Sequence, residues 1–127
     1  MELNELIARI LDAGITVSWT KLRHCNAGWD ASRQTIWMDH GLASTPRRAV
    51  SILAHEWAHA LLGHHGPQSP REEARADMVA AGILIDPADY ARAERIFDGD
   101  AHLIAQDLGV TVSLVRAFQG SLARVAC

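Results

Sequence analysis

The run His55-Glu56-Trp57-Ala58-His59 constrains the fold of this 127-residue chain more than any other feature. Two histidines four residues apart on a helix lie on one face, about 5–6 Å apart at their Cβ atoms. Apolar residues recur around the run at helical spacing, namely Ala49, Val50, Ile52, Leu53, Ala60 and Leu61. We therefore expect a helix that packs its apolar stripe into the core and presents both imidazoles together.

The ends of this helix are marked in the sequence. Ser44 or Thr45 is a suitable N-cap, and Pro46 then takes the first helical position. The helix should end near Gly63, and a loop should follow over residues 63–70, which contain two glycines and two prolines. Ser69 repeats the cap signal before a second proline, so a second helix should run to about residue 85.

The remaining segments predict an α+β fold in a single domain over residues 1–127. An amphipathic helix ends at Gly14, and strand-like segments follow at 15–20 and 34–38. Three residues between these segments are turn signals, namely Asn26, Gly28 and Asp30. They suggest a hairpin-like return, hence a small antiparallel sheet of two or three strands. A helical tail should complete the chain, with helices at 86–97, 100–108 and 112–121.

Composition excludes several classes of protein. The formal net charge of −3 offers no electrostatic footprint for nucleic acid. Cys25 and Cys127 are too few for a disulfide framework, which favours idle thiols in a reducing compartment. No apolar stretch is long enough to span a bilayer, and the N-terminus is acidic where a signal peptide would be basic. We therefore expect a soluble cytoplasmic protein with no membrane partner.

The chemistry of the histidine run points to zinc. Neutral imidazoles are good zinc ligands, and a catalytic site keeps three protein ligands plus a water whose pKa falls to about 7. Glu56 follows the first histidine directly, close enough to accept a proton from that water. We expect His55 and His59 as metal ligands and Glu56 as the general base.

The third ligand has two candidates. Glu73 lies early in the second predicted helix, and Asp77 follows on the same face, where it can orient a zinc-bound imidazole. His65 is the rival, six residues after His59 as in H-E-x-x-H-x-x-G-x-x-H sites. That motif needs glycine where this chain has Leu62, so we favour Glu73 over His65. His64 has no better claim as a ligand.

Two segments taken together resemble the ImmA/IrrE family of metallopeptidases. The first runs from Leu53 through the histidine run to Leu61-Leu62-Gly63-His64, and the second is Glu73-Ala74-Arg75-Ala76-Asp77. The resemblance implies a gluzincin-like peptidase with His55, His59 and Glu73 on zinc and Glu56 as general base. It also implies a bacterial or phage protein that cleaves a helix-turn-helix repressor in phage induction, mobile elements or stress responses.

Two further expectations concern partners. The strand at 34–38 could form the edge along which an extended substrate binds. Residues 100–121 have helix-turn-helix spacing, but their second helix offers only Arg116 and Gln119 for base contacts, so DNA binding is disfavoured. The alternative function is a non-catalytic regulatory module that binds a repressor or DNA and keeps a structural zinc.

Overall fold

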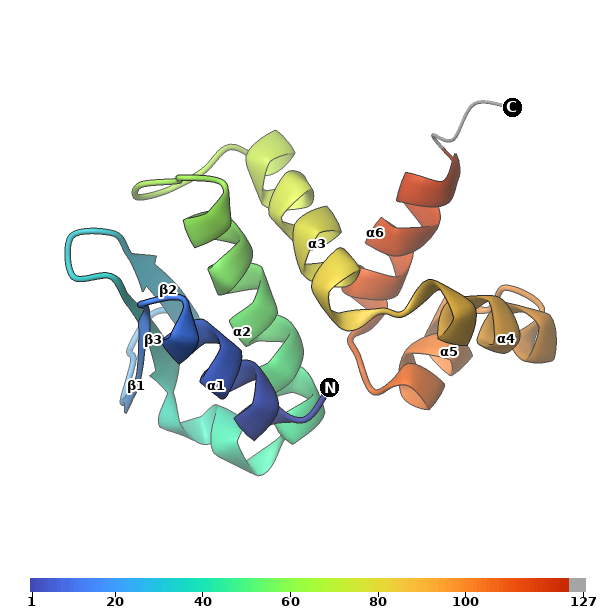
Figure 1. Cartoon of the computed structure of the whole chain (residues 1–127), viewed down its shortest axis with the longest axis horizontal. Coiled ribbons are helices and arrows are strands. Elements are labelled where there is room, and N and C mark those ends of the chain that lie inside the picture. Colours follow the sequence, from blue (N-terminus) through green and yellow to red (C-terminus); the bar gives the residue numbers. More distant parts are fainter. Residues whose placement is uncertain (124–127) are drawn as a thin grey trace.

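The computed structural model describes residues 1–123, and the α+β prediction is confirmed (Figure 1). Cys127 lies outside the described residues, whereas Cys25 is an exposed free thiol. The strands are β1 (Thr16–Thr20), β2 (Ala27–Asp30) and β3 (Thr35–Asp39). The helices are α1 (Leu3–Asp12), the 3-10 helix η1 (His40–Ser44), α2 (Pro46–Leu61), α3 (Pro70–Leu84), α4 (Pro87–Phe97), α5 (Ala101–Leu108) and α6 (Val112–Ala123).

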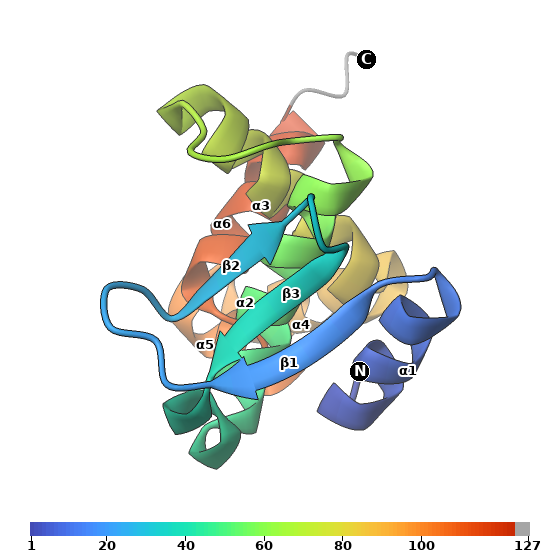
Figure 2. The same ribbon diagram turned by 90° about the vertical axis from the view of Figure 1, so that its left-hand side faces the viewer.

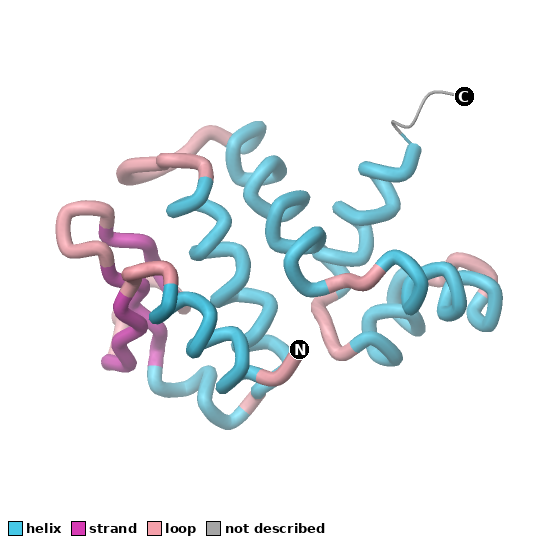
Figure 3. Tube along the Cα trace, in the orientation of Figure 1, coloured by secondary structure: helices cyan, strands magenta, loops and turns pink. Residues whose placement is uncertain are grey.

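Helix α2 is the central element of the molecule. The sheet and α1 lie on one side of it and α3 lies on the other, while α6 packs against α3 and the α4–α5 pair stands farthest from the sheet (Figures 1 and 3). Leu53, Ala54 and Ala58 of α2 are fully buried, as the apolar stripe predicts. Packing on both sides fixes the position and rotation of the helix that carries the histidine run.

The sheet is mixed, which corrects the prediction of an antiparallel sheet. The strand order is β1-β3-β2, and β1 runs parallel to β3 while β2 runs antiparallel to it (Figure 2). The hairpin therefore joins β2 to β3, through a turn in which Gln34 adopts a φ of 48°. Residues 27–30 form a strand despite Gly28 and Asp30, because pairing with β3 outweighs weak local propensity.

The predicted edge strand was also misplaced. The strand at 34–38 is β3, which is central in the sheet, and β2 lies at an edge. Among residues 1–123, no further strand pairs with the outer side of β2. Any segment that adds to the sheet next to α2 must therefore pair with β2.

The helix starts were located correctly, but only one predicted cap forms. Thr45 is the N-cap of α2, yet its hydroxyl donates to the carbonyl of Leu42 instead of capping the helix. Ser69 caps α3 as expected, since its Oγ accepts a hydrogen bond from the N–H of Glu72 at 3.2 Å. This cap fixes where α3 begins and hence which side chains of its first turns face α2.

The helical tail packs into the rest of the chain. Gly109 ends α5 with a left-handed φ of 72°, which turns the chain into α6. The apolar face of α6 is buried, and the ring of Phe118 lies 4.7 Å from that of Tyr90. None of the helices in residues 1–123 combines the length and apolarity needed to cross a membrane.

Candidate metal centre

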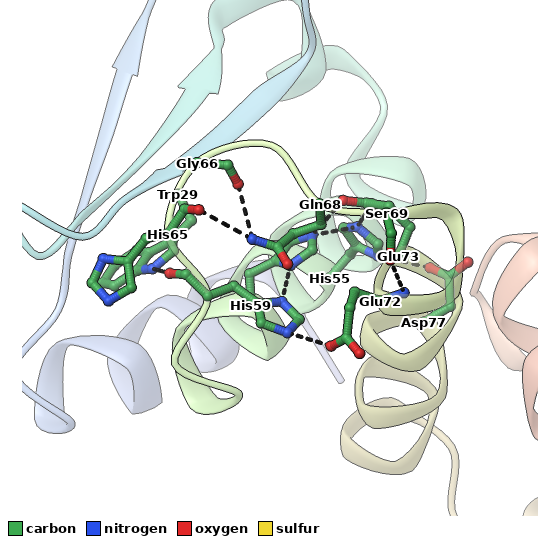
Figure 4. Close-up of polar contacts among 11 residues, drawn as sticks. Trp29, His55, His59, His65, Gly66, Gln68, Ser69, Glu72, Glu73 and Asp77 are labelled. Carbon is green, nitrogen blue, oxygen red and sulfur yellow. Dashed lines mark hydrogen bonds and ion pairs between the residues drawn. The ribbon is translucent and has the colours of Figure 1, made fainter.

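Two imidazoles of α2 and one carboxylate of α3 converge on a single point (Figure 4). His55 Nε2 lies 3.0 Å from His59 Nε2 and 2.9 Å from Glu73 Oε2. The other oxygen of Glu73 lies 3.2 Å from His59 Nε2. One helical turn separates the histidines, and the cap at Ser69 sets Glu73 opposite them. These three side chains could hold a metal ion.

The donor set is chemically suited to zinc. Zinc binds imidazole nitrogen and carboxylate oxygen at about 2.0–2.2 Å, and tetrahedral geometry then separates the ligand atoms by about 3.3 Å. The three separations given above lie near that value. Within residues 1–123, no fourth histidine, cysteine or carboxylate joins the group. Three protein ligands are typical of a catalytic zinc site, whereas structural sites usually have four.

Asp77 contacts the ring of His55 on the side opposite to Glu73. Its Oδ1 lies 2.7 Å from His55 Nδ1, the ring nitrogen that faces away from Glu73. Asp77 is one turn after Glu73 on α3, so both carboxylates face the same imidazole from the same helix. A hydrogen bond to Nδ1 orients the ring and leaves Nε2 directed at the metal position.

The second histidine has a different support, which the sequence analysis missed. His59 Nδ1 lies 2.8 Å from His64 Nδ1, and His64 Nε2 lies 2.7 Å from Glu72 Oε2. His64 contacts the opposite edge of the His59 ring from Glu73, so its ring stands behind the group of three. The available signal was Gly63 directly before His64, because a glycine after a helix reverses the chain toward its last turn.

Glu56 lies beside the metal-competent group. It lines a hollow of about 300 Å³ together with His55 and Asp77. Burial raises the pKa of Glu56 to about 7, although the charge of His55 and the backbone N–H of Trp29 act in the opposite direction. A carboxyl group that titrates near neutral pH can both accept and release a proton under physiological conditions.

The electrostatics of the group favour a bound cation. Burial lowers the pKa of His55, but the hydrogen bond and charge of Asp77 outweigh it and raise the pKa to about 9. His59 is only 6% exposed, and burial lowers its pKa despite the nearby charge of Glu73. Carboxylates therefore surround the two imidazoles, and burial favours the neutral form of His59. A divalent cation bound between these side chains would balance the negative charge of the carboxylates.

His65 lies away from this arrangement. It is exposed and does not belong to the group of three. Its carbonyl accepts a hydrogen bond from the side chain of Gln68 at 3.2 Å, within the loop that joins α2 to α3 (Figure 4). The structure therefore brings together His55, His59 and Glu73 but not the rival candidate.

Comparison with protein families decides the relationship. The family model for the IrrE N-terminal-like domain, a peptidase family, matches residues 10–118. The chain belongs to this family. The match spans all three strands, the helices α2 and α3 and most of the tail, so the ImmA/IrrE resemblance is confirmed. No curated protein matches the chain significantly.

Membership of the family gives the group of three a chemical context. The family supports a metallopeptidase-type role, and the chain places two histidines and a glutamate where they could hold a metal. The group lies beside a hollow that opens along α2, and β2 packs on the same helix. Of the three residues that could hold a metal, His55 lines this hollow, next to Glu56.

Proposed function

We propose that this protein is a zinc-dependent endopeptidase. In this proposal His55, His59 and Glu73 bind zinc, and Asp77 orients the ring of His55. The observation that carries it is the convergence of two Nε2 atoms and a carboxylate within 3.2 Å of one another, beside a half-buried glutamate. Zinc bound there would act as a Lewis acid and lower the pKa of a coordinated water to about 7.

Glu56 is the proposed general base. It would accept the proton of the attacking water and later deliver it to the leaving amine. The backbone N–H of Trp29 reaches its carboxylate from β2. This contact would hold the carboxylate at the wall of the hollow.

The proposed substrate site is the outer side of β2. Asp39 N donates to the carbonyl of Asn26 at 2.8 Å, which marks these residues as a hydrogen-bonded pair of the β2–β3 ladder. By the alternation of an antiparallel ladder, Ala27 and Trp29 direct their N–H and C=O groups away from β3. An extended peptide that pairs with Ala27 and with the carbonyl of Trp29, whose N–H faces Glu56, would lie along the hollow that Ala27 and Glu56 both line.

The proposed substrate is a helix-turn-helix transcriptional repressor. This part rests on the family resemblance alone, and it implies a role in phage, mobile-element or stress regulation in the cytoplasm. Direct DNA binding by the tail is disfavoured, since α6 offers only Arg116 and Gln119 for base contacts. The competing function is a regulatory module with a structural zinc.

Replacement of Glu56 by glutamine tests the proposal. The variant should keep stoichiometric zinc, measured by elemental analysis, and lose cleavage by about 10²- to 10⁴-fold because the general base is gone. Cleavage can be followed without a known substrate by comparing new protein N-termini in cells that express the wild type or Glu56→Gln. New termini within helix-turn-helix regulators should depend on Glu56. Equal cleavage by both proteins would favour the non-catalytic module.

A further inference from the structure

The loop after α2 carries a further histidine, His64, which contacts His59 on the side away from the proposed metal position. His64 is largely buried, with its side chain 11% exposed, although it lies in the connection between α2 and α3. Its ring joins His59 on one side to Glu72 on the other, at 2.8 and 2.7 Å. We propose that His64 and Glu72 are positioning residues that fix the ring orientation and tautomer of His59. This inference rests on the proposed function.

Hydrogen-bond chemistry allows only one proton arrangement in this chain of contacts once His59 Nε2 binds a metal. The proton of the neutral His59 ring then sits on Nδ1, which must donate to His64 Nδ1. His64 consequently carries its own proton on Nε2 and donates it to Glu72. Since an ionised carboxylate can only accept, Glu72 sets the direction of both hydrogen bonds. The result favours the tautomer of His59 whose Nε2 lone pair faces Glu73.

The backbone around His64 is built to hold this orientation. His64 N donates to His59 O at 3.0 Å and Gly63 N donates to Ala60 O at 3.1 Å, with Gly63 at a φ of 72°. These contacts form a Schellman cap, which turns the chain back over the last turn of α2. The carbonyl of His64 accepts from Trp29 Nε1 at 3.1 Å, so β2 anchors the same residue from the other side.

The glycine at position 63 thus has a different role from the glycine of H-E-x-x-H-x-x-G-x-x-H sites. A glycine at position 62 would direct the chain toward a ligand at position 65, whereas glycine at position 63 places residue 64 against His59. The pattern His59-x-x-x-Gly63-His64 is therefore the sequence form of a supporting histidine. Outer-sphere partners of this kind raise ligand basicity, and their loss commonly weakens metal binding by 10- to 100-fold.

Zinc affinity, measured by competition with a chromophoric chelator, tests the inference. His64→Leu removes the acceptor for His59 Nδ1–H and should weaken zinc binding by about 10- to 100-fold. His64→Asn places an amide oxygen where His64 Nδ1 now lies. Its zinc affinity should lie within about tenfold of the wild-type affinity. The matched control is His65→Leu in the same loop, which should bind zinc as the wild type does.

A role in loop folding alone would give a different pattern. It would lower the melting temperature of the zinc-free chain without separating His64→Asn from His64→Leu in zinc affinity. The inference is overturned if folded His64→Leu binds zinc like the wild type, or if His64→Asn is equally weak. Glu73→Ala in the same titration separates the two proposals. If Glu73→Ala retains zinc affinity, the ligand assignment itself fails. If Glu73→Ala loses zinc affinity while His64→Leu keeps it, only the positioning role of His64 is rejected.

Discussion

His55 and His59 lie one turn apart on the same helix, yet the structure supports their rings in different ways. Asp77 contacts His55 directly from α3, through a carboxylate 2.7 Å away. His59 is contacted by another imidazole from the loop, and the carboxylate of Glu72 stands one residue further back. One support depends on the packing of two helices, and the other depends on a glycine turn that returns the chain to α2.

The difference follows from where each ring lies on α2. His55 is one turn further from the C-terminus of α2, opposite the second turn of α3, so a carboxylate there reaches it. His59 lies in the last turn, beside the loop. Glu73 in the first turn of α3 contacts its Nε2 directly, but on the Nδ1 side the nearest carboxylate, Glu72, reaches it only through His64. The His55 support should therefore be the stronger and the less dependent on loop conformation.

Removal of the direct carboxylate should have the largest effect. Asp77→Ala should weaken zinc binding by about 10- to 100-fold, because His55 Nδ1 loses its acceptor and the ring its orientation. Asp77→Asn keeps an acceptor and should be milder. Asp77→Asn should still lower zinc affinity more than Glu72→Gln does. The charge lost at Asp77 is in contact with the proposed ligand His55, whereas the charge lost at Glu72 is separated from His59 by His64. Equal affinities for these two amide variants, in chelator competition, would mean that the supports are equivalent.

Gly63→Ala should affect mainly the His59 side. Its φ of 72° is left-handed, so a Cβ should destabilise the chain by about 1–2 kcal/mol even though nothing lies within 4 Å of it. Zinc affinity should fall as well, because His64 loses its placement. Gly82→Ala is the matched control, since Gly82 is within α3 with equal space and ordinary φ. It should stabilise the chain by about 0.5–1 kcal/mol. Urea unfolding of both variants measures the contrast.

The pH dependence of the zinc-free protein should separate the two histidines. The pKa of His55 is raised to about 9 and that of His59 is lowered, so NMR titration should place them on opposite sides of 6.5. The stabilisation from protonated His55 beside Asp77 is complete below about pH 6.5 and is lost as pH rises through about 9. Asp77→Asn should consequently destabilise the zinc-free chain more at pH 6 than at pH 10. A pH-independent cost would contradict the assigned charge on His55.

Local patterns predicted the parts of this molecule that depend on a single helix. The apolar stripe and Pro46 located α2, and Ser69 located α3, because caps and helical periodicity act over a few residues. The proximity of Glu73 and Asp77 to the histidines also followed, since two helices joined by a short loop pack antiparallel. The sheet was predicted less well. Residues 27–30 have no strand signal of their own, and only pairing with β3 makes them a strand.

By itself, the sequence determined the histidine helix, the residue types available to a metal and the family to which the chain belongs. The tertiary structure decided which strand borders the hollow, because strand order depends on pairing energies between distant segments. It also decided the partner of His59. Spacing identified His64 only as a poor ligand, whereas the turn at Gly63 and the contact with Trp29 place its ring behind one. Such contacts form between three segments that are separate in the sequence, so the local spacing of residues does not predict them.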